Sequence, residues 1–162
     1  MKKEESYETK AYWLGYLAAM IDGEGTISLH KITERRWRGK FHEGTYWYPI
    51  VQVGNDNKES LEILQDLCKG GSISPSIIEG KIRYCYHIPP NIQRKMLPLL
   101  SLIIKEEHRT LILEALEKVG RWNKTLENEI RLEQIYEWFK VHNRRGGRPK
   151  VYNRGEDNLK VL

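Results

Sequence analysis

The chain alternates between segments of helical and of strand periodicity. Residues 11–22 (AYWLGYLAAMID) are apolar on nearly all sides, which is typical of a helix buried on several sides. Residues 26–38 and 45–53 are rich in β-branched and aromatic side chains, so we expect two strands joined by a turn between Gly39 and Gly44. The chain is therefore predicted to begin with a helix and a β-hairpin.

A second helix and hairpin follow. Asp56 and Glu59 have the spacing of a capping box, and apolar residues then recur at helical spacing until two glycines end the pattern. Residues 72–78 and 81–88 are β-rich runs joined by a Glu-Gly turn. These runs predict the second hairpin.

Helical patterns dominate the remainder of the chain. A short helix is expected from about residue 91, interrupted by Pro98, and residues 106–119 and 125–142 have clear helical periodicity. The element order is thus α-ββ-α-ββ-α with two further helices. It predicts an α+β fold in which helices cover one face of a four-stranded antiparallel sheet and leave the other face open.

Length and composition limit the function classes. A chain of 162 residues with 40% hydrophobic and 30% charged residues suits one soluble domain over residues 1–162, and the longest apolar runs are too short to cross a bilayer. The charged segment 1–10 lacks the apolar stretch of a secretory signal, so an intracellular (cytoplasmic or organellar) location is expected. Cys68 and Cys85 lack CxxC spacing, which favours buried core residues over a disulfide or a zinc site.

Positive charge is concentrated at the end of the chain. The net charge is +5 and the pI is about 9.1. The tail, residues 143–162, contains six basic and only two acidic side chains. This distribution suits a polyanionic partner, although many basic proteins bind no nucleic acid.

Residues 17–25 (LAAMIDGEG) are the most informative stretch. They resemble the nine-residue signature LAGLIDADG of the homing endonucleases that carry this name, and the four substitutions are conservative. A buried helix before the stretch and a strand after it match the context of the motif. The identical positions are Leu17, Ala18, Ile21, Asp22 and Gly25.

One face of this predicted helix carries little side-chain bulk. Gly15, Ala19 and Gly23 lie at positions i, i+4 and i+8, so an identical helix could approach backbone to backbone about a twofold axis. The alternative is that this face packs inside its own domain. The resemblance implies a homodimer through this helix, with an interface formed by Gly15, Ala18, Ala19, Asp22 and Gly23.

Two carboxylates at the end of this helix need an explanation, because the C-terminal pole disfavours negative charge. If a twofold axis adds the partner's acids, divalent cations would relieve the repulsion and support phosphodiester hydrolysis. The resemblance implies that Glu24 is the metal-binding carboxylate, that the Gly25 carbonyl also approaches the metal, and that Asp22 is structural. The expected cofactor is Mg²⁺ or Mn²⁺, whereas Ca²⁺ would bind without supporting cutting. For Glu24, simple solvation at a helix end is the alternative.

The resemblance also implies polar residues around the metal. Asn55, or less favourably Gln52, would organise water, and Lys105 matches the active-site lysine of the family. Lys58 is a second candidate cation. The alternative for both lysines is an ordinary surface position.

The open face of the sheet is the expected DNA-binding surface, since the family uses its sheet as a saddle in the major groove. A solvated strand face, and a solvated tail, are the alternatives. Candidates for reading base edges are Ser28, His30 and Gln52. Basic candidates for contacts to bases or phosphates are Lys31, Arg35, Arg36, Arg38, Lys40 and Arg83, with Arg144, Arg145 and Arg148 of the tail adding phosphate contacts.

The sequence therefore predicts a site-specific DNA endonuclease that makes staggered double-strand breaks in a long, pseudo-palindromic target, with no membrane association and no small-molecule substrate. One alternative is an RNA maturase or a non-cleaving DNA-binding regulator with the same fold. Another is a small RNA-binding protein, although no ribonucleoprotein-type aromatic motif is present.

Overall fold

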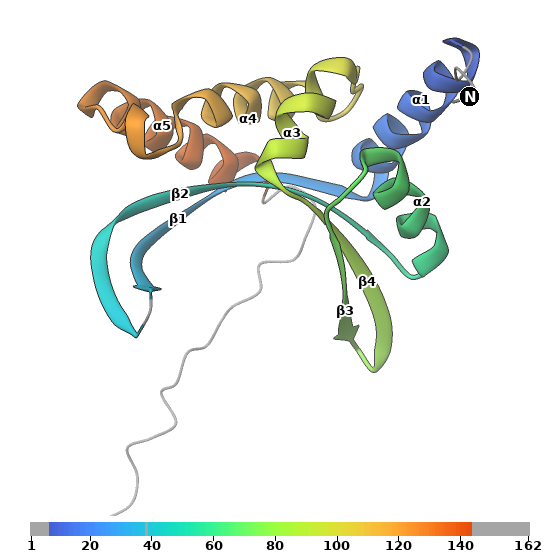
Figure 1. Cartoon of the computed structure of the whole chain (residues 1–162), viewed down its shortest axis with the longest axis horizontal. Helices are drawn as coiled ribbons and strands as arrows, with labels where there is room; N and C mark the ends of the chain where they lie inside the picture. Colours follow the sequence, from blue (N-terminus) through green and yellow to red (C-terminus); the bar gives the residue numbers. More distant parts are fainter. Residues whose placement is uncertain (1–6, 38, 144–162) are drawn as a thin grey trace, which may run out of the picture.

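The computed structural model describes residues 7–37 and 39–143. Its main elements follow the order α-ββ-α-ββ-α-α-α, which confirms the predicted α+β fold (Figure 1). The elements are α1 (Tyr7–Glu24), β1 (Gly25–Trp37), β2 (Lys40–Asn55), α2 (Lys58–Cys68), β3 (Ser72–Ile78), β4 (Lys81–Ile88), α3 (Pro90–Met96), α4 (Glu106–Lys118) and α5 (Leu126–His142), with short 3-10 turns at Leu97–Leu99 and Arg121–Asn123.

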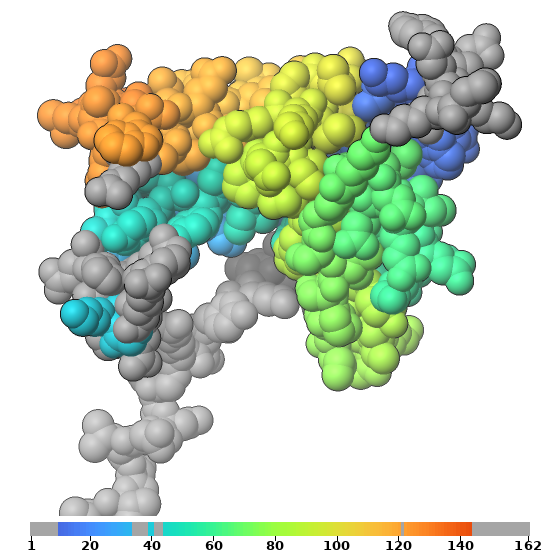
Figure 2. All heavy atoms as spheres, in the orientation of Figure 1, coloured from blue at the N-terminus to red at the C-terminus, as the bar shows by residue number. Residues whose placement is uncertain are grey.

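The four strands form one antiparallel sheet in the order β1-β2-β4-β3. β1 and β2 pair from Gly25 opposite Val53 to Trp37 opposite Lys40, with a register shift between Ile32 and Glu34. The sheet is arched: both hairpins curve away from the helices, which all lie on the convex side (Figure 1). The space-filling view shows the hollow between the two hairpins (Figure 2).

Side-chain alternation separates the two faces of the sheet. Ile27, Val51 and Tyr86 are completely or almost completely buried against the helices, and each large apolar side chain removed from water contributes about 1.5–3 kcal/mol. Leu17 and Ile21 of α1 belong to the same core. The concave face carries the intervening residues, which leaves their polar side chains available for function.

Some local predictions were wrong in detail. α1 begins at Tyr7 and ends at Glu24, so it is longer than the apolar pattern indicated. The N-cap of α2 is Asn57 rather than Asp56: the Asn57 side chain accepts a hydrogen bond from the Ser60 N–H at 3.3 Å. An amide side chain caps a helix as well as a carboxylate does, so spacing alone did not select between the two neighbours.

The cysteines and the membrane prediction can be compared directly. Both cysteines are free, and Cys68 is buried as predicted, whereas Cys85 is only half-buried. None of the helices in residues 7–37 and 39–143 is long and apolar enough to cross a membrane.

Candidate active site at the end of helix α1

α1 passes into β1 without a loop, and this junction depends on Gly25. A Cβ atom at this position would lie 2.4 Å from the carbonyl oxygen of Ile21 and 2.7 Å from its Cα. No real Cβ atom tolerates such contacts with backbone, so a side chain at residue 25 would force the helix and the strand apart. The glycine therefore fixes the direction in which the preceding residue, Glu24, leaves the helix.

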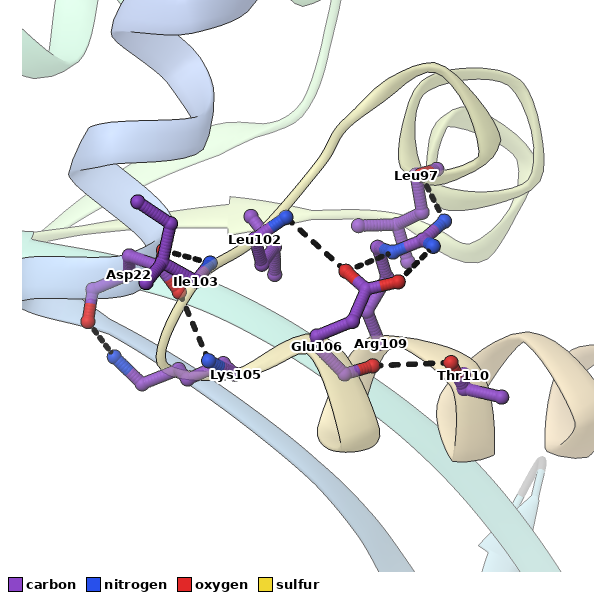
Figure 3. Close-up of polar contacts among 8 residues, drawn as sticks. All are labelled: Asp22, Leu97, Leu102, Ile103, Lys105, Glu106, Arg109 and Thr110. Carbon is purple, nitrogen blue, oxygen red and sulfur yellow. Dashed lines mark hydrogen bonds and ion pairs between the residues drawn. The ribbon is translucent and has the colours of Figure 1, made fainter.

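Asp22 is held by contacts within its own chain. Its carboxylate accepts hydrogen bonds from the backbone N–H groups of Ile103 at 2.6 Å and Lys105 at 3.0 Å (Figure 3). It also accepts one from the backbone N–H of Ile104 at 3.3 Å. Partial burial alone would raise the pKa of Asp22, but these three donors and the Lys105 charge together hold the pKa below its ordinary value. Asp22 thus anchors the loop between the Leu97–Leu99 turn and α4 to the end of α1.

Lys105 closes the same end of the helix from the other direction. Its Nζ donates to the carbonyl oxygen of Ile21 at 2.9 Å and also to that of Asp22. A cation at a helix C-terminus satisfies carbonyls that have no partner within the helix and compensates its negative pole. Partial burial lowers the pKa of Lys105, while the nearby charges of Asp22 and Glu24 oppose this shift.

Glu24 leaves the helix in a different environment. Its side chain is about half exposed (51%), and its carboxylate accepts a hydrogen bond from Nη2 of Arg83 at 3.2 Å. Arg83 is on β4, on the strand face that carries Cys85 and His87. The Glu24 carboxylate therefore lies at the open face of the sheet, where a large ligand can reach it.

Arg83 is a feature of this site that the sequence did not reveal, since it had been predicted only as a DNA contact. The guanidinium also lies 3.8 Å from the Asp56 carboxylate, so it bridges two acids that precede different elements. It rests over Gly54, where a Cβ atom would be 3.3 Å from Arg83 Nε. The strand alternation of β4 was a usable signal for the face of Arg83, but not for its partner 59 residues away.

The donor atoms at this site suit a hard divalent cation but are too few in the described part of a single chain. The Glu24 carboxylate and the Gly25 carbonyl are oxygen ligands of the kind that Mg²⁺ and Mn²⁺ prefer. Within the described part of the chain, no group of three His, Cys, Asp or Glu residues could hold a metal ion. A metal site here thus needs ligands from another molecule, such as a second copy of the chain, a nucleic acid or water.

The small-residue face of α1, formed by Gly15, Ala19 and Gly23, is open to solvent. The dimer interface was predicted on this face. Added Cβ atoms at Gly15 and Gly23 would meet nothing within 4 Å, and Ala19 between them is exposed. Ala18 is partly buried and packs against the core. The alternative, that this face packs inside its own domain, is therefore wrong for Gly15, Ala19 and Gly23.

The middle of the open face is a row of polar side chains at matched positions. Gln52 pairs with Thr26 on one side and with His87 on the other, and Ser72 lies beyond His87. His87 is exposed, and its Nε2 is 3.0 Å from Ser74 Oγ. Sequence reasoning proposed Gln52 but missed His87 and Ser74, although the alternation of β3 and β4 could have found them.

Other predicted site residues have local partners. The amide oxygen of Asn55 accepts a hydrogen bond from the Asn57 backbone N–H at 2.8 Å and shapes the turn before α2. Lys58 pairs with Glu62 at 2.8 Å along α2. Neither contact joins these side chains to Glu24, so their assigned roles stay predictions.

Lys31 requires a correction. It was expected on the open face together with Ser28 and His30, but it lies on the face that the helices cover. Its Nζ is 2.5 Å from the Glu133 carboxylate of α5 and 5.4 Å from the centre of the Trp47 ring. Residues at odd and even positions of a strand point to opposite faces, so an odd-numbered lysine beside buried Leu29 cannot join Ser28 and His30.

The remaining DNA-contact candidates lie on β1, at the start of β2 or outside the described residues. Ser28 is half-buried and His30 is exposed, both on the open face, and Lys40 is exposed at the start of β2. Arg35 and Arg36 belong to the outer part of β1. Arg38, and Arg144, Arg145 and Arg148 of the tail, lie outside the described residues.

The arched sheet, the helices on its convex side and the helix-to-strand junction at Gly25 are the fold of the LAGLIDADG homing endonucleases. One similar structure is that of an archaeal intron-encoded homing endonuclease, I-Vdi141I, complexed with DNA: the TM-score is 0.66 at 19% identity, over 86% of this chain and 89% of that chain. The homing endonuclease I-CvuI, in complex with a DNA target in the presence of 2 mM Mg, has a TM-score of 0.61 at 16% identity, over 88% and 87% of the two chains.

A third similar structure is longer than this chain. The LAGLIDADG meganuclease I-CpaMI, bound to uncleaved DNA, matches with a TM-score of 0.57 at 19% identity, over 88% of this chain but only 53% of its own. No protein-family model and no curated protein sequence matches the chain. At these identities the likeness establishes a shared fold, which confirms the fold that the resemblance of residues 17–25 implied.

Proposed function

We propose that this protein is a site-specific DNA endonuclease that acts as a homodimer and needs a divalent cation. The observation that carries this proposal is the position of Glu24. Its exposed carboxylate lies at the open face of the sheet, at the end of the helix whose small-residue face is bare. Two copies that meet along this face would bring their two Glu24 residues together.

Such a meeting explains the incomplete donor set of a single subunit. Glu24 and the Gly25 carbonyl from each copy would hold the cation together with a DNA phosphate and water. When bound, a divalent cation supplies Lewis-acid chemistry, which lowers the pKa of water and offsets the charge of the scissile phosphodiester. The similar I-CvuI structures contain DNA targets in the presence of 2 mM Mg or 2 mM Ca, which supports this class of cation.

The protein residues have separable tasks in this proposal. Lys105 lies near Glu24, and the contacts of its Nζ with two helix carbonyls fix its position. Arg83 neutralises Glu24 before the cation binds, and its guanidinium can then turn to a phosphate. Asp22 orients the loop that carries Lys105 and remains inside the subunit.

Double-stranded DNA would lie in the concavity of the sheet. By strand alternation Gln52, His87 and Ser28 belong to the open face of the sheet, and polar side chains on a strand surface can read the major groove. Each subunit would read one half of a nearly palindromic target. The structures of the similar proteins I-Vdi141I and I-CpaMI contain DNA, which supports DNA as the ligand of this fold.

Plasmid cleavage tests the proposal. The full chain is incubated with plasmids that carry fragments of a randomised target library, with Mg²⁺ and with Mg²⁺ plus chelator. We expect linear product with staggered ends only in the first reaction, and none from the Glu24→Gln variant. Glu117→Gln, an exposed acid on α4, is the matched control. Cutting that persists in chelator, or in Glu24→Gln, would contradict the proposed site.

A non-cleaving DNA-binding regulator with this fold is the second candidate. It would retain the open face but would have no need for an accessible acid at position 24. The cleavage assay together with a duplex-binding assay on the same library separates the two functions: duplex binding without any Mg²⁺-dependent cutting, over the whole target library, would favour the regulator.

A further inference from the structure

Two adjacent isoleucines project into solvent next to the end of α1. Ile103 is 92% exposed and Ile104 is 74% exposed, which places them among the most exposed apolar side chains in the described part of the chain. Leu102, just before them, is buried. The loop is thus anchored to the core on one side and presents two large aliphatic side chains on the other. Adjacent exposed apolar side chains of this size mark a contact surface.

The position of this pair is fixed by hydrogen bonds. The backbone N–H groups of Ile103 and Ile104 both donate to the carboxylate of Asp22, at 2.6 and 3.3 Å. The close-up shows Ile103 beside the last turn of α1 (Figure 3). The two side chains are therefore held at the helix and do not depend on a freely moving loop for their exposure.

The pair borders the small-residue face. Asp22 is three residues after Ala19, so its side chain leaves the helix about 60° away from that of Ala19. A loop bound to Asp22 consequently flanks the face formed by Gly15, Ala19 and Gly23. Any molecule that packs closely on this face reaches the two isoleucines as well.

We infer that Ile103 and Ile104 extend the contact surface of α1 and pack against a second copy of this chain. The inference rests on the proposed function, because the homodimer through α1 is part of it. Backbone contact along a small-residue face buries little apolar area by itself. Aliphatic side chains beside this face add the buried apolar area that stable interfaces have. The isoleucines have no donor for a phosphate, whereas the DNA-facing side of this helix end carries Glu24 and Arg83. These differences favour a protein partner over DNA.

Sedimentation equilibrium of the full chain over a range of concentrations tests the inference. The variant Ile103→Ser/Ile104→Ser is compared with Ile77→Ser, a matched control that removes an equally exposed isoleucine (77%) from β3. Ala19→Glu serves as a variant that blocks the helix face itself. Because all these side chains are exposed, we expect the thermal unfolding of each monomer to be unchanged. The double variant should weaken dimerisation by at least roughly tenfold, and Ile77→Ser should not change it.

The other outcomes separate this inference from the proposed function. A dimer that is lost in Ala19→Glu but unchanged in the double variant would overturn the role of the isoleucines and keep the dimer through α1. A double variant that dimerises normally but binds duplex DNA more weakly would overturn the inference in favour of a DNA contact. A wild-type chain that is monomeric at every concentration would overturn the inference, and plasmid cleavage would then show whether the endonuclease proposal survives.

Discussion

The two sides of the C-terminal end of α1 use the same chemical group for opposite purposes. On one side, Asp22 accepts three backbone hydrogen bonds from residues 103–105 and serves the fold. On the other side, Glu24 is half exposed and meets only the guanidinium of Arg83 among the contacts described for its side chain. The comparison teaches that the surroundings of a carboxylate, rather than its place in a motif, decide whether it stabilises the fold or remains available for a ligand.

The largest expected effect is the loss of plasmid cleavage in the Glu24→Gln variant. If Glu24 is the functional acid, cleavage of a plasmid target should fall by roughly 10³-fold or more, because the amide no longer holds a cation. The free energy of unfolding should change by no more than about 0.5 kcal/mol, as for other surface substitutions. Cleavage rates and urea unfolding of the same preparation check both statements. A variant that lost folding stability instead would show that Glu24, like Asp22, stabilises the fold.

Gly25→Ala should disturb the positions of both Asp22 and Glu24, because it changes the junction between α1 and β1. The added methyl group meets the backbone of Ile21, so helix and strand must separate, which costs about 3 kcal/mol of folding stability. Gly15→Ala is the matched control: its Cβ meets nothing within 4 Å, and the helix should gain about 0.5–1 kcal/mol in the monomer. Urea unfolding at concentrations where both variants are monomeric measures the difference. Equal stabilities would show that the junction is less tight than the geometry indicates.

Asp22→Asn should mainly lower the free energy of unfolding. The amide keeps one acceptor oxygen but turns its NH₂ group toward backbone donors, and loss of these charge-assisted hydrogen bonds costs about 2 kcal/mol. Asp66→Asn, an exposed acid in α2, is the control and should leave stability unchanged. Unfolding that is equally affected in both variants would mean that the loop is held by other contacts.

The stability due to Asp22 should depend on acid pH. Its folded pKa lies below the ordinary value of 3.8, since the effect of its hydrogen bonds outweighs that of partial burial. The folded protein therefore holds this proton less tightly than the unfolded chain. The stabilisation is complete above the unfolded pKa and is lost as the pH falls through the folded pKa. The difference between wild type and Asp22→Asn should be constant above about pH 5 and should close below about pH 4 in urea unfolding.

The elements of the fold were largely predictable because they depend on local patterns. β3 and β4 have the predicted bounds, and α4 ends one residue before the prediction. The errors lie where an element continues beyond its apolar pattern, as α1 does by beginning at Tyr7, or where two neighbours suit a cap equally, as at Asn57.

The site was predictable only as far as the motif reached. The stretch at 17–25 indicated Glu24, Gly25 and the small-residue face, but the partners of its acids come from distant parts of the chain. Arg83 is 59 residues from Glu24, and the donors to Asp22 are more than 80 residues away. Such pairings depend on the packing of β4 and of the loop before α4, which no periodicity describes. Lys31 was misplaced for a different reason, since a loosely alternating strand was not assigned strictly to two faces.

The smallest expected effect concerns Arg83 and how strongly it protects Glu24. A cation that binds Glu24 must compete with the guanidinium, but an ion pair with both side chains near half exposure contributes at most about 1 kcal/mol. Arg83→Gln should therefore tighten the binding of Mn²⁺, measured from the free-ion signal by electron paramagnetic resonance, by no more than about fivefold. Lys81→Gln, the same change of charge on the same strand, is the control. If Arg83→Gln instead weakened Mn²⁺ binding, the guanidinium would be supporting the cation site. The surroundings of Glu24 would then be as fixed by the fold as those of Asp22.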